Sequence, residues 1–587
     1  MALAAVLCCA ITTTVLTSCS AEDNSSGDPT HDKAVVGNWY ADTTNKTFPL
    51  WNYGPAWNKM TFNADGTGSF DTFYTLEGKA IARDNQTFTY TTTSDGHLTM
   101  VMEDGNFDYT YQLSGGQLTL AYDDKVVAYD KADAEMASKF DEWSQQELIQ
   151  VPNAARYTVF VYGNAGGGMD DIIEKGFWEE VKPLLTDSLN VRVVCFYKYG
   201  QKTISEYEDD GDIVWFELNS KTDLNKLREE GFANHGLAEQ AKKLKLCDPA
   251  SLQMFMELSS LLCPAKEYVF SIWGHGSGFE PLNDVPGKYA TNAPLRRGVI
   301  ADEWNEHEQL DMYELAQAIR ESGAVRSMNT IFFHNCLMGN LETLTELRDV
   351  TKYICCSAHI LSSNGEVLSG FVKGLMEQQN TEDAVKQMFQ EIDPIWNNGY
   401  NDSDKPCNGD FKMLRTSKFD GILNACKQLA TRLVELYPTQ REAIDRASKT
   451  VYRFRNIGKH EAFSTITAPF FDLADYAHKL AQETGDKQLV AISDDIDRAF
   501  NDLIIHYADV SWNEQHLDHY TLSVCLYHQF YYTYDFIGAG NKIRANINDG
   551  YEQSNFHKLT GWGNFLRINE AFSIDNPSSQ GGGPLNK

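Results

Sequence analysis

Four apolar runs constrain most strongly what this chain can fold into. Each is a run of bulky side chains free of glycine and proline, at residues 157–162, 191–197, 268–273 and 330–333. Stretches with helical spacing lie between them, such as residues 312–322. Continuous apolar strands that alternate with helices predict an α/β domain, in which helices cover both faces of a parallel sheet.

The part of the chain before these runs has a different pattern. Residues 35–131 carry short alternating runs, such as 87–91, joined by turns of the Asp-Gly and Gly-Gly type. Such runs and turns predict a small all-β domain whose strands form a meander that closes on itself. A chain of 587 residues is also too long for one core, so at least two domains are expected.

The N-terminus has the features of an export signal. Residues 2–16 are apolar, too few to span a bilayer as a stable helix, and fit the core of a signal peptide. Leu16-Thr17-Ser18-Cys19 resembles the lipobox of bacterial lipoproteins. That resemblance implies removal of residues 1–18, lipid attachment to Cys19 and anchoring at the bacterial cell envelope, on the outer membrane, the surface or the periplasmic face. An ordinary secretory signal or a short anchor are the alternatives.

Charge and cysteine spacing restrict the partners. The formal net charge of −32 repels nucleic-acid phosphates, so a nucleic-acid partner is not expected. None of the 12 cysteines forms a CxxC pair repeated at zinc spacing, so we expect no metal site.

Two of the apolar runs end in reactive side chains. One continues as Gly274-His275-Gly276, and another as His334-Asn335-Cys336. Ligands of open parallel sheets bind beyond the carboxyl ends of the strands. If the two strands are neighbours, His275 and Cys336 project into one cleft; otherwise Cys336 is a buried spectator and His275 a loop residue. The leucines after Cys336 recur at helical spacing, which predicts a helix whose N-terminus lowers the pKa of the thiol.

Longer motifs around these residues resemble the clostripain-type cysteine peptidases, relatives of caspases, legumains and gingipains. The matching segments are WGHGSG at 273–278, VIADE at 299–303, LDMYELAQAI at 310–319 and NTIFFHNCLMGNLETLTEL at 329–347. The resemblance implies a caspase-like fold for residues 155–575. The motifs GNW, DGTG and GGQLTL within residues 35–131 resemble the lipocalin-like domains at the front of bacterial lipoproteins.

By this resemblance Cys336 is the nucleophile and His275 the general acid of a peptidase that acts through an acyl-enzyme. The backbone N–H groups of Gly276 and Cys336 would form the oxyanion hole. Proteins or peptides are the implied substrates, no cofactor is required, and some relatives are activated by calcium.

One position departs from the family pattern. Members usually carry an aspartate two residues before the cysteine, in the pocket for a substrate Arg or Lys, but this chain has His334 there, beside Asn335. A preference for basic residues is therefore not implied. Relatives also cut themselves between the two catalytic residues, and Arg296 and Arg297 are the candidate self-cleavage residues.

The sequence also predicts a helical connector at residues 132–154 and, in the stretch rich in Ser, Gly and Pro at 576–587, a disordered tail. The leading interpretation is a lipid-anchored cysteine endopeptidase. The alternatives are a non-catalytic, ligand-binding surface lipoprotein with a degenerate caspase-like scaffold, and a thiol hydrolase acting on amide bonds of other polymers.

Overall fold

The computed structural model describes most of the chain after residue 30. The described residues are 31–43, 56–76, 78–103, 105–122, 125–131, 134–164, 170–187, 189–199, 213–227, 243–274, 276, 278, 298–302, 308–322, 324, 328–359, 361, 365–398, 409–454, 470–510, 521–526, 529–534, 541–546 and 551–569. Among them the chain forms two compact units; the first contains residues up to 41, 58–71 and 85–144, and the second the remainder.

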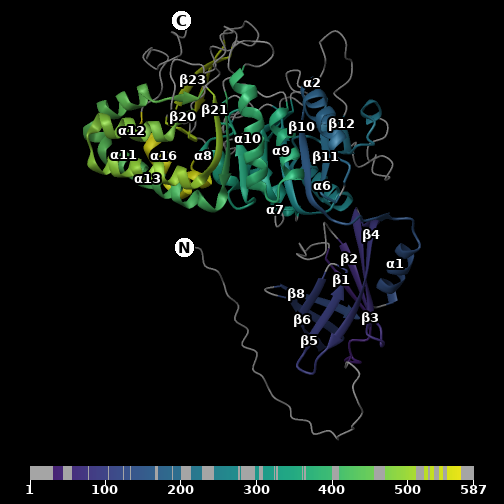
Figure 1. Ribbon diagram of the computed structural model, residues 1–587. Coiled ribbons are helices and arrows are strands. Elements are labelled where there is room, and N and C mark those ends of the chain that lie inside the picture. The colour runs from purple at the N-terminus through teal and green to yellow at the C-terminus, as the bar shows by residue number, and fades with distance from the viewer. Residues whose placement is uncertain are drawn as a thin grey trace. The chain divides into compact units, whose positions relative to one another are not determined.

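The first eight strands of the described chain form a closed antiparallel barrel (Figure 1). The strands are β1 (Gly37–Asp42), β2 (Ala56–Phe62), β3 (Thr67–Leu76), β4 (Lys79–Thr92), β5 (His97–Met102), β6 (Gly105–Ser114), β7 (Gln117–Tyr122) and β8 (Lys125–Lys131). They follow the order β3-β2-β1-β8-β7-β6-β5-β4, and β3 pairs with β4 to close the barrel. Along β2, every second side chain is buried, which is the pattern expected when one face of a strand lines a core. The predicted lipocalin-like barrel is confirmed.

Two short elements follow the barrel strands. Helix α1 (Ala134–Ser144) lies within the segment predicted to be helical, and β9 (Ile149–Gln150) adds a parallel strand beside β4.

An eight-stranded sheet forms the centre of the second unit (Figure 1). Its strands, in spatial order, are β12 (Ile213–Leu218), β11 (Val191–Lys198), β10 (Ala155–Asn164), β13 (Ala265–Trp273), β16 (Met328–His334), β17 (Tyr353–Cys356), β18 (Gly409–Arg415) and β21 (Ile504–Val510). The five from β11 to β17 are parallel, and four of them, β10, β11, β13 and β16, are the predicted strands. The sheet as a whole is mixed, because β12, β18 and β21 run antiparallel to their neighbours.

Both faces of this sheet are covered, which explains the long apolar runs of its central strands. On β16, Ile331 and Phe333 pack into the core that contains α6 (Pro249–Leu262) and α7 (Met312–Glu321). Phe332, between them, packs into the opposite core with α9 (Glu366–Glu377) and α10 (Thr381–Asn398). Successive side chains of a strand point to opposite faces, so a doubly covered strand needs apolar residues at every position.

The other helices are mostly short or belong to the C-terminal part. They are α2 (Asp170–Ile173), the π-helical turn η1 (Glu174–Trp178), α3 (Glu179–Val181), the 3₁₀ turns η2 (Lys182–Leu184), η3 (Leu224–Lys226) and η6 (Thr416–Lys418), α8 (Leu341–Leu347), α11 (Phe419–Thr450), α12 (Leu473–Thr484), α13 (Lys487–Leu503), α15 (Asn555–Thr560) and α16 (Trp562–Ile568). Helices α11, α12 and α13 make residues 419–450 and 473–503 almost wholly helical. No helix in the described ranges is both long and apolar enough to cross a bilayer.

Three small sheets complete the unit. They are β14 (Gly298–Asp302) with β15 (Glu308–Asp311), β19 (Arg453–Phe454) with β20 (Phe470–Asp472) and β22 (Ser523–Cys525), and β23 (Gln529–Tyr534) with β24 (Asn541–Asn546). The sequence over residues 520–527 is typical of a strand. Its described part, β22, is shorter and pairs with β20 rather than joining the central sheet.

The order of the strands marks where a site can form. The chain places β11 on one side of β10 and β13 on the other, so the connections diverge between β10 and β13. Ligands of open α/β sheets bind at such a switch point, beyond the carboxyl ends of the strands. Residue 275 follows β13, and Cys336 follows the neighbouring strand β16.

Candidate active site

Cys336 lies in a sharp reversal of the chain. Strand β16 ends at His334, and Leu337 has a φ of 60°, a left-handed conformation that is costly for a leucine. The N–H of Leu337 donates to the carbonyl of His359 (2.8 Å), and that of Gly339 to Ser357 (2.7 Å). Residues 337–339 therefore run antiparallel to residues 357–359, although the strands that precede these segments, β16 and β17, are parallel. The chain therefore turns back directly after the cysteine, which places Cys336 at the tip of the reversal.

The environment of the thiol differs from the expectation drawn from the sequence. Cys336 is half-buried, and burial raises the pKa of its thiol to about 11, against a smaller lowering by a hydrogen bond from the backbone of Leu361. Helix α8 begins only at Leu341, and the side chain of Asn340 caps it by accepting from the N–H of Thr343. Since the field of a helix end fades within about one turn, the helix does not lower this pKa as predicted.

His275 lies outside the described residues, but its neighbours in the chain lie against the cysteine loop. The side-chain amide of Asn335 donates to the carbonyl of Gly274 (3.1 Å). A Cβ added to Gly276 would lie 2.4 Å from the carbonyl oxygen of Cys336 and 2.8 Å from the Cβ of Asn335. The backbone of Gly276 thus approaches Cys336 as closely as only a glycine can.

His334 occupies the position of the family's usual aspartate and is covered by Trp273. The imidazole and indole rings are stacked, with centroids 3.8 Å apart and planes 1° apart. His334 is only 3% exposed, and burial lowers the pKa of its imidazole to about 3. The ring is therefore neutral at physiological pH and supplies no charge of either sign. Asn335, the other predicted pocket residue, is buried and ties the two strand ends together.

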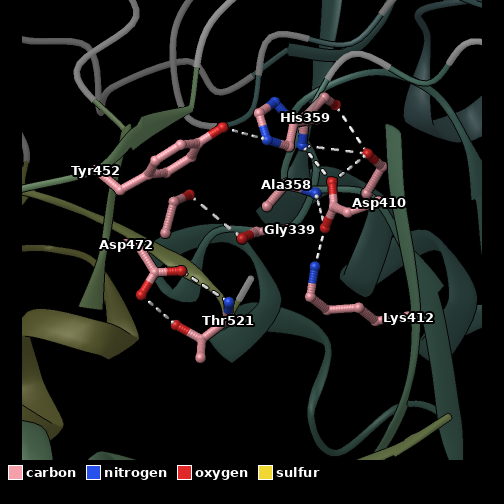
Figure 2. Close-up of polar contacts among 10 residues, drawn as sticks. Gly339, Ala358, His359, Asp410, Lys412, Tyr452, Asp472 and Thr521 are labelled. Atoms are coloured by element: carbon pink, nitrogen blue, oxygen red, sulfur yellow. Dashed lines mark hydrogen bonds and ion pairs between the residues drawn. The ribbon is translucent and has the colours of Figure 1, made fainter. Parts of the chain in front are cut away.

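A buried polar network lies beside the reversal (Figure 2). The carboxylate of Asp410 accepts from the hydroxyl of Ser357 (2.9 Å), from the N–H groups of Ala358 (3.2 Å) and His359 (2.7 Å), and from the ammonium group of Lys412. Sequence reasoning missed these residues, because charged side chains in a strand pattern are normally assigned to the surface.

A second group of polar contacts joins the same region to the C-terminal part of the chain. The hydroxyl of Tyr452 bonds to Nε2 of His359 (2.9 Å), as Figure 2 shows. The N–H of Ser523 donates to the carbonyl of Gly339 (2.9 Å). Segments far apart in sequence therefore converge on the turn at residues 357–359 and on the loop after Cys336.

Two glutamates of helix α8 hold the helix in place. Glu342 is fully buried and accepts from the N–H of Cys525 (2.9 Å) and the hydroxyl of Tyr551 (3.1 Å). Glu346 accepts from the backbone and side-chain nitrogens of Asn555 (2.8 and 2.6 Å). These carboxylates connect the helix that follows Cys336 to residues 525–555, in the C-terminal part of the chain.

The other predicted site residues, Cys19, Arg296 and Arg297, lie outside the described residues. No group of three or more His, Cys, Asp or Glu side chains in the described part of the chain could hold a metal ion.

Comparison with known proteins identifies the family. The profile of the clostripain family, peptidase family C11, matches residues 185–556. Comparison with curated protein sequences gives no significant match. Among solved structures, a secreted C11 cysteine protease from Bacteroides thetaiotaomicron, iotapain, is 16% identical, with a TM-score of 0.43, over 70% of this chain and 100% of that chain. An inactive zymogen C11 protease from Parabacteroides distasonis is 12% identical, with a TM-score of 0.38, over 70% and 99%. The family profile spans more than half of the sequence, and so this chain belongs to the clostripain family and is a cysteine peptidase.

Proposed function

We propose that this peptidase cleaves peptide bonds with Cys336 as the nucleophile and His275 as the general acid. The observation that carries the proposal is the register of two neighbouring parallel strands. Trp273 of β13 lies opposite His334 of β16, and residues 275 and 336 each follow this pair by two positions. The contacts of Gly274 and Gly276 with Asn335 and Cys336 support the same pairing.

The chemistry proceeds in two stages. The sulfur of Cys336, after its proton passes to the imidazole of His275, attacks the carbonyl carbon of the scissile bond. The C–N bond breaks, His275 protonates the departing amine, and a thioester remains on Cys336. Water then attacks the thioester, releasing the second product as a carboxylic acid and restoring the thiol.

The oxyanion that forms in each stage needs hydrogen-bond donors that are already in place. We assign this role to the backbone N–H groups of Gly276 and Cys336. The close approach of Gly276 to the carbonyl of Cys336 supports the assignment, because it leaves no room for a side chain between the two segments.

Labelling with an iodoacetamide probe tests the pair directly. Cys336 is the one half-buried cysteine among the free cysteines described, and the other seven are buried. We expect rapid labelling of Cys336 that is strongly reduced by His275→Ala, since the imidazole generates the thiolate. Equal labelling of the variant and the unchanged protein would refute the pair.

The neutral, stacked imidazole of His334 leads to a proposal about specificity. A guanidinium or ammonium group would find no carboxylate at this position, so we propose that recognition of the residue before the scissile bond does not rest on an ion pair here. Cleavage of a peptide library should show no dominance of Arg or Lys, and His334→Asp should raise cleavage after Arg. An unchanged preference in the variant would remove His334 from the pocket.

Three further parts of the proposal rest on the sequence. The protein is anchored at the cell envelope through lipid on Cys19, so Cys19→Ala should abolish incorporation of labelled palmitate. Self-processing at Arg296 or Arg297 would give a new N-terminus at Arg297 or Gly298. No cofactor is needed for hydrolysis, and a loss of activity in EDTA that calcium restores would establish calcium activation.

A further inference from the structure

The fully buried ion pair of Asp410 and Lys412 has no place in the chemistry described above. Both side chains are 0% exposed and both belong to β18. Burying two charges costs solvation free energy, and well-packed apolar side chains are often at least as stable in such positions. A contribution to stability therefore does not by itself explain why the pair is buried here. The hydrogen bonds of Asp410 indicate a second role.

The carboxylate of Asp410 fixes the turn after β17. One oxygen accepts from the hydroxyl of Ser357 and the N–H of His359, and the other from the N–H of Ala358 and from Lys412. Donors thus approach both oxygens, an arrangement that the amide of an asparagine cannot reproduce because one of its two ends is itself a donor.

The same turn holds the loop of the nucleophile. Its two outer carbonyls, of Ser357 and His359, accept from the N–H groups of Gly339 and Leu337. Leu337 directly follows Cys336 and has the left-handed backbone at which the chain reverses. The turn at residues 357–359 therefore connects the carboxylate to this strained backbone through hydrogen bonds on both sides. Figure 2 shows those that Asp410 accepts.

We propose that Asp410, neutralised by Lys412, is a positioning residue for Cys336: it fixes the turn at 357–359, which in turn fixes the backbone at Leu337 and Gly339. This inference rests on the proposed role of Cys336. Misplacement of a nucleophile by about 1 Å can reduce turnover about a hundredfold, so the contribution falls on kcat rather than on KM.

The test compares two double variants of the full chain. Asp410→Asn combined with Lys412→Met removes the pair without leaving an unpaired charge. The matched control, Arg192→Met with Glu217→Gln, removes the largely buried, bidentate ion pair between β11 and β12. We expect the first to lower kcat about tenfold to a hundredfold with KM changed less than about twofold, and the control to change neither by more than about twofold.

Hydrogen exchange supplies a readout that does not depend on turnover. The amides of Leu337 and Gly339 should exchange at least about tenfold faster in the Asp410/Lys412 variant than in the control, because their acceptors are no longer held. A folded variant in which these amides stay protected, or in which kcat is unchanged or only KM moves, overturns the proposal.

Two other results of these experiments also have a defined interpretation. If the double variant does not fold, Ser357→Ala, which removes one of the donors to Asp410, carries the test. It should lower kcat about threefold to tenfold and speed exchange at the same amides, and unaltered values would overturn the proposal. If the unchanged protein shows no hydrolysis that depends on Cys336, the proposed function fails, and hydrogen exchange alone decides whether Asp410 positions the loop.

Discussion

At the scale of single residues, the neutral burial of His334 makes stability depend on pH. The pKa of its imidazole is about 3 in the folded chain, against an ordinary value of 6.5. Between these values the unfolded chain binds a proton that the folded chain excludes. The stabilisation is therefore present above pH 6.5 and is lost progressively as the pH falls toward 3. From pH 7 to pH 5 the loss amounts to about 2 kcal/mol.

His334→Gln removes the titrating group while keeping a polar side chain. Its free energy of unfolding, measured by urea denaturation at several pH values, should fall less steeply below pH 6.5 than that of the unchanged protein. Parallel curves for the two proteins would show that His334 is not the group responsible.

The left-handed backbone of Leu337 gives a second prediction at this scale. Leu337→Ala and Leu337→Gly both remove the side chain beyond Cβ. The difference between their free energies of unfolding therefore reports mainly on the backbone conformation. Since φ is 60°, we expect the glycine variant to be more stable than the alanine variant by about 1 kcal/mol.

Lys427, exposed in helix α11, provides the control. Here Lys427→Ala should be more stable than Lys427→Gly, by about 1 kcal/mol, because the backbone is helical. The same order of stability at both positions in denaturation experiments would show that Leu337 stores no backbone strain.

At the scale of elements, the close contact between the ends of β13 and β16 admits no side chain at Gly276. In Gly276→Ala the new methyl group would meet the carbonyl oxygen of Cys336 at 2.4 Å, so one of the two segments must move. We expect a loss of peptide hydrolysis of about a hundredfold, because the nucleophile or its oxyanion donors are displaced.

A glycine in open surroundings is the matched comparison. A Cβ on Gly421, in the first turn of α11, would meet only the Cβ of Ala499 at 3.7 Å. Gly421→Ala should leave activity unchanged and raise the free energy of unfolding by about 0.5–1 kcal/mol. Kinetic assays of both variants decide the matter, and a fully active Gly276→Ala protein would contradict the tight packing at the site.

The elements that could be predicted from the sequence are those in which burial leaves an uninterrupted pattern. β10, β11, β13 and β16 each contain a mostly apolar run because both faces of the sheet are covered. β18 was missed because Asp410 and Lys412 interrupt its apolar pattern, and only the folded chain shows that the two charges neutralise each other.

The position of the candidate site could be predicted from the sequence, but its electrostatics and its distant contacts could not. The sequence places both reactive residues at the carboxyl ends of strands, the edge at which ligands of parallel sheets bind. That β13 and β16 are neighbours is known only from the fold. The pKa of the thiol was not predictable, since it depends on burial and on a hydrogen bond from the backbone of Leu361, and both come from the fold. The partners of Glu342 come from residues 525 and 551, and no local pattern connects them.

At the scale of the whole molecule, the net charge of −32 should influence which peptides reach the site. A strongly negative protein attracts cations over distances set by the Debye length, which is about 30 Å at 0.01 M salt and about 10 Å at 0.1 M. This attraction acts on the charge of the whole peptide, whereas the side chain before the scissile bond is recognised by its pocket.

Two peptides with the same residues around the scissile bond separate these effects. One carries several lysines far from that bond, and the other carries serines in their place. The kcat/KM of the lysine peptide should be higher at 0.01 M salt and should fall several-fold by 0.2 M, while that of the serine peptide should stay nearly constant. The long-range field raises only the rate of encounter with the cationic peptide, and salt screens it. If both peptides respond equally to salt, the charge of the molecule does not steer its substrates, and any preference for basic peptides must come from the pocket itself.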